Sequence, residues 1–173
     1  SEIKTALCSR GFEQIESLLQ FAHDNKFQGI EYTIEEESYE GFDRIYDKLQ
    51  RLRGSELEIR YHLPFKRREL GLRDKETAEK ALAYLKYVLD AVACLGGTHI
   101  ITHLGLGYSD RDHCLSYDHA VRNLKSLKEY ADTKNIGVVL ENLRFGLARA
   151  PEPHKYILEN TGCRACLDIG HAS

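Results

Sequence analysis

Short apolar runs alternate with longer amphipathic stretches along the whole chain. The runs are rich in β-branched and aromatic residues, which predicts strands, over residues 3–8, 29–34, 57–63, 99–103, 137–142 and 164–169. Between them, apolar residues recur every three or four positions, which predicts helices, over residues 12–24, 42–52, 74–95, 117–134 and 151–158. This alternation predicts an α/β fold, in which helical crossovers connect the strands of a parallel sheet.

Side chains with metal-binding or acid–base chemistry follow four of the apolar runs. His62 and His103 come at the ends of the third and fourth predicted strands, and Glu141 near the end of the fifth. Asp168 lies near the end of the sixth, with His171 three residues later. One histidine or carboxylate at a strand end is ordinary, but five on four consecutive strands indicate a shared site.

Two folds fit this order of elements, an open doubly wound sheet and a (β/α)8 TIM barrel. In an open sheet the site lies at one switch point of the strand order. In a barrel it draws on the carboxyl ends of many strands. The spread of candidate residues over four strands favours the barrel. A complete barrel has about 250 residues, so we expect residues 1–173 to form one domain with about six of the eight strands.

The candidate residues indicate a metal site. Imidazole and carboxylate ligands together suit a borderline divalent ion, Zn²⁺ or Mn²⁺ above all. Gly170 allows a sharp turn after Asp168, so that His171 either returns toward the ion or contacts substrate at the rim. Asn142, beside Glu141, either orients a ligand or a water molecule or caps the chain after its strand.

Three adjacent cations, Lys66, Arg67 and Arg68, stand in the loop after the third predicted strand. Close to the shared site, they could hold a phosphate group of a substrate. The alternative is an exposed loop without a binding role.

Composition narrows the class of protein. A hydrophobic content of 42% with 29% charged residues is typical of a soluble globular protein. No apolar run approaches the roughly 20 residues that span a bilayer, and the first residues lack the layout of a signal peptide, so we expect a cytoplasmic protein. The net charge of −3 gives no general attraction to nucleic acid. The lack of methionine and the end of the chain soon after His171 suggest a piece of a longer protein.

With these residues in place, the sequence resembles the xylose isomerase-like barrel superfamily. This superfamily holds sugar isomerases and epimerases together with abasic-site nucleases of the endonuclease IV type. The matching segments occur in the superfamily's order: Gly29-Ile30-Glu31, Tyr61-His62-Leu63-Pro64-Phe65, Thr102-His103-Leu104-Gly105, Leu140-Glu141-Asn142 and Leu167-Asp168-Ile169-Gly170-His171. Each motif is short, but the ordered series is specific to the superfamily, although not to one activity.

The resemblance implies different metal sites in the two branches. In the isomerase and epimerase branch, Glu141 and Asp168 would bind one divalent ion, and Glu141 would also move a proton. In the nuclease branch, all five candidates would bind zinc ions: His62, His103, Glu141, Asp168 and His171. In both branches, the remaining ligands come from strands later than the sixth.

Three functions follow in order of preference. The first is a metal-dependent isomerase or epimerase of a sugar, sugar phosphate or polyol, with Glu141 and His171 as catalytic candidates and a carbohydrate as its small-molecule partner. The second is an endonuclease IV-type zinc-dependent abasic-site nuclease, the one hypothesis of the three with a nucleic acid partner. The third is an inactive barrel used as a binding module, in which a homodimer could cover the two open edges of a six-stranded sheet.

Overall fold

The computed structural model describes residues 5–34, 42–65, 68–105 and 114–171. Six strands alternate with five helices in the described part of the chain. The strands are β1 (Ala6–Cys8), β2 (Gly29–Thr33), β3 (Glu58–His62), β4 (His99–Thr102), β5 (Gly137–Glu141) and β6 (Arg164–Cys166). The helices are α1 (Ile15–Asp24), α2 (Phe42–Arg53), α3 (Lys75–Cys94), α4 (Tyr117–Asp132) and α5 (Pro151–Thr161).

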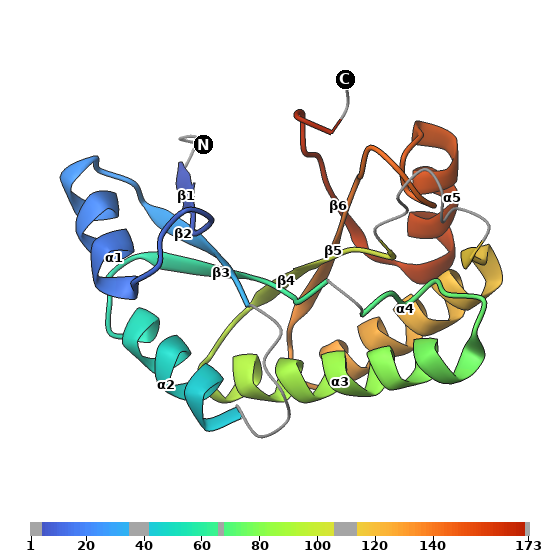
Figure 1. The fold of residues 1–173 in the computed structure, drawn as a ribbon, viewed down its shortest axis with the longest axis horizontal. Coiled ribbons are helices and arrows are strands. Elements are labelled where there is room, and N and C mark those ends of the chain that lie inside the picture. The colour runs from blue at the N-terminus through green and yellow to red at the C-terminus, as the bar shows by residue number, and fades with distance from the viewer. Residues whose placement is uncertain (1–4, 35–41, 66–67, 106–113, 172–173) are drawn as a thin grey trace.

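The strands form one parallel sheet in chain order, β1-β2-β3-β4-β5-β6. This order has no reversal, so the doubly wound alternative with its switch point is excluded. The helices wrap one side of the sheet, and β1 and β6 lie at opposite edges beside the two chain ends (Figure 1). The arrangement is the curved wall of a (β/α) barrel, as predicted.

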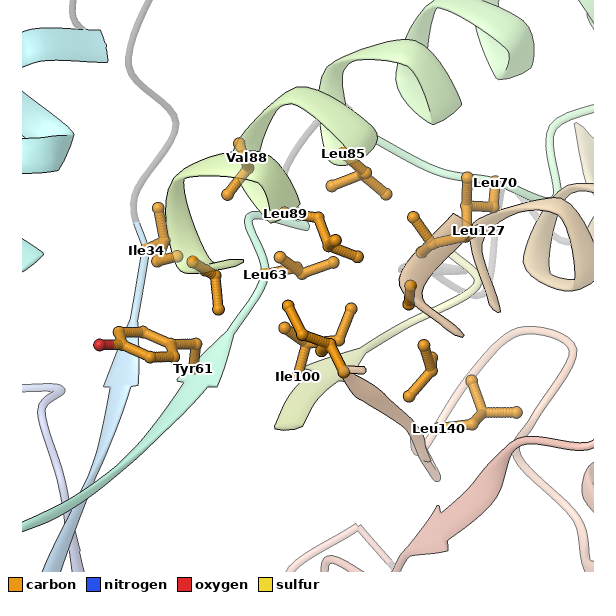
Figure 2. Packing of buried hydrophobic residues seen from close by; sticks show 14 of the residues in the cluster. Ile34, Tyr61, Leu63, Leu70, Leu85, Val88, Leu89, Ile100, Leu127 and Leu140 are labelled. Atoms are coloured by element: carbon orange, nitrogen blue, oxygen red, sulfur yellow. The ribbon is translucent and has the colours of Figure 1, made fainter. Parts of the chain in front are cut away.

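The hydrophobic core lies between the sheet and its helices. Leu85, Val88 and Leu89 of α3 face the sheet, and Leu127 of α4 packs beside them (Figure 2). From the sheet side, Tyr61, Ile100 and Leu140 complete the layer. These side chains are at most 2% exposed. Burial of each large apolar side chain contributes about 1.5–3 kcal/mol, so this layer fixes the helices and therefore the sheet.

Strand alternation decides which residues reach the other side of the sheet. Neighbouring side chains on a strand point to opposite faces. Tyr61 packs into the core, and His62, the next residue, points away from the helices. The same alternation separates Leu140, in the core, from Glu141. In both strands, one residue thus packs into the core and the next places a polar side chain on the opposite face of the sheet.

Two helix starts show why the elements begin where they do. The Asp74 carboxylate accepts a hydrogen bond from the Thr77 backbone N–H at 2.9 Å before α3, and the Ser116 hydroxyl accepts one from His119 N–H at 3.4 Å before α4. Such caps satisfy N–H groups that the first helical turn leaves without partners. The prediction that Asp74 opens the longest helix is confirmed.

The last strand is shorter than predicted. It ends at Cys166 rather than Ile169, and the apolar side chains of Leu167 and Ile169 are 71% and 81% exposed. Beyond Cys166, the side chain of Asn142, the residue after β5, holds the chain by hydrogen bonds to the backbone of Asp168. These side-chain bonds take the place of a backbone ladder. The first helix also begins later than predicted, at Ile15 rather than Phe12. In the described part of the molecule, no helix is long and apolar enough to cross a membrane.

Candidate metal centre

Three buried side chains from three neighbouring strands meet at the carboxyl edge of the sheet. His62 ends β3, His103 follows β4 and Glu141 ends β5. His103 Nε2 lies 2.7 Å from Glu141 Oε2, and His62 Nε2 lies 3.1 Å from both that oxygen and His103 Nε2. We call these three residues the buried triad. The sequence predicted that side chains from separate strand ends lie close together, and the structure brings these three together.

The hydrogen bonds around His62 indicate what the triad can bind. Its Nδ1–H donates to the Leu63 carbonyl oxygen at 2.8 Å, so the neutral ring carries a lone pair on Nε2. That lone pair faces the lone pairs of Glu141 Oε2 at 3.1 Å. Only a proton or a metal ion between the two atoms makes this contact favourable. Two imidazoles and a carboxylate are also a ligand set that zinc binds, so the triad fits a divalent ion.

The electrostatics keep the triad in the ionisation state that a cation requires. Burial lowers the pKa of His103, and this effect outweighs the hydrogen bond to Glu141 that raises it. Burial would raise the pKa of Glu141, but the close contacts of its carboxylate with the imidazoles of His103 and His62 hold the pKa of this carboxyl well below its usual range. Glu141 is therefore ionised and His103 neutral at ordinary pH. Metal binding needs both states.

A second group shares Glu141 with the buried triad. His171 Nδ1 lies 3.7 Å from Glu141 Oε1 and 3.5 Å from Asp168 Oδ2. One ligand atom from each of these residues lies within 4.8 Å of the others. We call Glu141, Asp168 and His171 the rim group, because Asp168 and His171 are half-buried. Glu141 thus presents one oxygen to each group.

Asn142 joins the rim group to β5. Its side-chain Nδ2–H donates to the Asp168 carbonyl oxygen at 3.0 Å, and its Oδ1 accepts from Asp168 N–H at 2.7 Å. The side-chain amide of Asn142 therefore both donates to and accepts from the Asp168 backbone, as the backbone of a paired strand residue would. Arg144 donates two further hydrogen bonds to the Gly170 carbonyl oxygen, at 2.9 and 3.1 Å. Asn142 thus positions the backbone of Asp168. The predicted role of Asn142 in orienting a ligand or a water molecule stays a prediction.

Of the three predicted phosphate-binding cations, the structure describes Arg68. Lys66 and Arg67 lie outside the described residues. The Arg68 guanidinium lies over the ring of Tyr84 on α3, 4.2 Å from its centroid, and thus against the helical layer. A phosphate-binding role for these three residues stays a prediction.

Sequence reasoning missed two residues beside the triad. The ring of Phe65 lies 5.3 Å from that of His62 and 5.0 Å from that of His103, and Arg10 lies over the same ring. Phe65 stood within a motif of the resemblance but was given no role. Arg10 follows β1, a strand that ends in no predicted ligand, so the sequence carried no signal for it.

Comparison with known proteins supports the fold. The family described as xylose isomerase-like TIM barrel matches residues 10–173. The TTHB071 protein from Thermus thermophilus, solved after soaking with ZnCl2, is 22% identical with a TM-score of 0.73 and matches over 99% of this chain. D-psicose 3-epimerase from Clostridium cellulolyticum H10, solved with D-tagatose, is 15% identical with a TM-score of 0.77 over 98%.

The chain spans 68% of the length of the first of these structures and 64% of the second. At such identities the likeness concerns the fold, which is that of a TIM barrel. No curated protein matches the chain.

Proposed function

Because the chain belongs to the xylose isomerase-like TIM barrel family, we propose that it carries the metal-binding part of an isomerase or epimerase. Its substrate would be a sugar, a sugar phosphate or a polyol. Similar structures include a D-psicose 3-epimerase and an L-ribulose 3-epimerase, which supports this substrate class. The chain covers 64% and 60% of the length of these two proteins, so the proposal concerns the whole protein's activity.

One observation carries the proposal: the two oxygens of Glu141 face different partners. Oε2 faces the imidazoles of the buried triad, and Oε1 faces the rim group. One oxygen can therefore hold a metal ion while the other takes up a proton from the substrate. The triad and rim residues would hold Zn²⁺ or Mn²⁺. When bound, such an ion polarises a substrate carbonyl and so acidifies the neighbouring C–H bond.

The side chains around Glu141 define the proton's path. Glu141 is ionised, so its carboxylate has the free oxygen lone pairs to accept the proton and return it to the adjacent carbon or to the other face. His171, half-buried at the rim, lies on the Oε1 side of Glu141, where substrate would arrive. It would contact a substrate hydroxyl or assist the transfer.

The experiment is to incubate the metal-loaded protein with ketoses, their phosphates and polyols in deuterated water. We expect deuterium at a carbon next to the carbonyl of at least one sugar, measured by NMR. The Glu141→Gln variant should lose this exchange, and Glu129→Gln, at an exposed position of α4, should retain it. No exchange with any member of the panel would refute the proposal.

A second candidate rests on the sharing of Glu141 between two ligand groups. A carboxylate that bridges two nearby ions is typical of enzymes that cleave phosphodiester bonds, which favours a zinc-dependent abasic-site nuclease as the alternative. Two or three zinc ions per chain by elemental analysis, with nicking of a duplex that contains an abasic site, would support this alternative. A protein that takes up no metal and forms a stable homodimer would instead favour a binding module.

A further inference from the structure

Arg10 stands on a rigid part of the same edge of the sheet that carries the metal ligands. It follows β1 directly, next to the buried Ser9. Ser9 N–H donates to the Glu31 carbonyl oxygen at 2.9 Å, and Ser9 Oγ accepts from Thr33 N–H at 2.9 Å. Phe12 N–H donates to the Ser9 carbonyl oxygen at 3.2 Å. The two Ser9 bonds fix the backbone before Arg10 to β2, and the Phe12 bond closes the turn that contains Arg10 onto Ser9.

The Arg10 side chain is directed to the buried triad through an aromatic ring. Its Cζ lies 5.2 Å from the centroid of Phe65. The same ring contacts the imidazoles of His62 and His103. Arg10 therefore borders the triad through the ring of Phe65.

The guanidinium keeps its hydrogen-bond donors available. Contact of a cation with a ring face is electrostatic and uses no acceptor atom. Two other arginines have carboxylate partners: Arg51 pairs with Glu16 and Arg60 with Glu58. Among the residues that the structure describes, no carboxylate pairs with Arg10. An exposed fork of N–H donors beside a metal-binding group is thus left for a ligand.

We propose that Arg10 binds an oxyanion of the substrate, either a carboxylate or a phosphate group. The planar guanidinium matches two oxygens of such a group at once. Phe65 would hold the guanidinium in place while the triad and rim residues hold the reacting end of the same molecule. This inference rests on the proposed function and narrows its substrates to acidic sugars, sugar phosphates and their relatives.

The test follows Arg10 itself in zinc-loaded protein labelled with ¹⁵N-arginine. Inorganic phosphate and acetate are titrated separately, and the Nε–H signals are recorded by NMR. Arg10→Gln assigns the Arg10 signal, and Arg53→Gln, at the exposed end of α2 remote from the triad, is the control. We expect the Arg10 signal to shift to saturation with at least one anion. Loss of charge-assisted hydrogen bonds should weaken binding in Arg10→Gln about tenfold or more, with Arg53→Gln unchanged.

The two anions distinguish the sources of the oxyanion. A shift with phosphate alone indicates a sugar phosphate, and a shift with acetate indicates a carboxylate. No shift of Arg10 with either anion, or equal binding by Arg10→Gln and the unaltered protein, would overturn the inference. Zinc uptake is measured in parallel: its absence in the unaltered protein would refute the proposed function, whereas normal zinc uptake without an effect of Arg10 would refute this inference alone.

Discussion

The buried triad and the rim group use the same carboxylate but are built in different ways. The triad's side chains come from the ends of three packed strands, and His62 and Glu141 are 1% and 8% exposed. The rim group takes Asp168 and His171 from the turn after β6, and both are half-buried. Atoms of the triad approach within 2.7–3.1 Å, whereas those of the rim group stand 3.5–3.7 Å apart.

The difference shows which interactions hold the buried triad and which hold the rim group in place. The strands of the triad are fixed by the hydrophobic layer on their other face, so core packing itself orients the three side chains. The rim turn has no such layer, because Leu167 and Ile169 are exposed. Its geometry depends on hydrogen bonds from Asn142 and Arg144 and on the Asp168 carboxylate, which accepts from Gly170 N–H at 2.6 Å. We therefore expect the triad to tolerate loss of polar contacts that would disorder the rim group.

Glu141→Gln should have the largest effect, because both halves lose their shared anion. We expect affinity for Zn²⁺ to fall by more than about 100-fold, since even loss of a residue that only orients a ligand costs about 10- to 100-fold. Isothermal titration calorimetry with Glu129→Gln as control measures it. Metal binding within threefold of the unaltered protein would show that the carboxylate is not a ligand.

His103→Asn should come next and should affect the triad alone. One strand-borne ligand is lost, and we expect affinity at the triad to fall about 100-fold while Asp168 and His171 keep any ion of the rim group. Zinc titration with His23→Asn, at an exposed position of α1, as control measures it. A larger loss in His171→Asn than in His103→Asn would reverse the order that we assign to the two halves.

Asn142→Ala should affect the rim group alone. All ligands remain, but the turn loses the amide that pairs with Asp168, so we expect about tenfold weaker binding at the rim. Hydrogen exchange should show faster opening at the Asp168 N–H, with no change in β4. The control is Asn160→Ala on α5, whose amide bonds only within its own helix. Unchanged exchange at Asp168 would contradict the role of Asn142.

Arg144→Gln should have the smallest effect. The arginine is exposed, and water can replace its hydrogen bonds to the Gly170 carbonyl oxygen, so we expect about threefold weaker binding at the rim. The measurement is zinc titration beside Arg53→Gln. An effect larger than that of Asn142→Ala would mean that the guanidinium, rather than the amide, holds the turn.

Much of the triad could be predicted because strand periodicity and parallel pairing leave little choice. Once Tyr61 and Leu140 are assigned to the core, the alternation of a strand sends His62 and Glu141 to the opposite face. Parallel strands in chain order then bring their carboxyl ends together. The helix start at Asp74 was equally local, since the cap and its N–H partner are three residues apart.

The contacts that escaped prediction are those between residues that lie far apart in sequence. Arg10, after β1, lies over the ring of Phe65, after β3, and Arg68 lies over the ring of Tyr84 on α3. The side chain of Asn142 bonds the backbone of Asp168, 26 positions later, where a longer strand would have used backbone hydrogen bonds. No periodicity records such contacts. The last strand was predicted too long for a related reason: its apolar residues suggested burial, yet nothing in the described structure covers Leu167 and Ile169.

The sequence separation within the triad has a consequence for folding. His62 is 41 residues from His103 and 79 from Glu141, so the three meet only after β3, β4 and β5 have paired. An unfolded chain cannot offer this ligand set, in contrast to sites built from neighbouring residues of one helix. An ion held here would bind the native state alone and would stabilise it in proportion to the logarithm of its free concentration. Metal supply would then set the protein's resistance to unfolding as well as its chemistry.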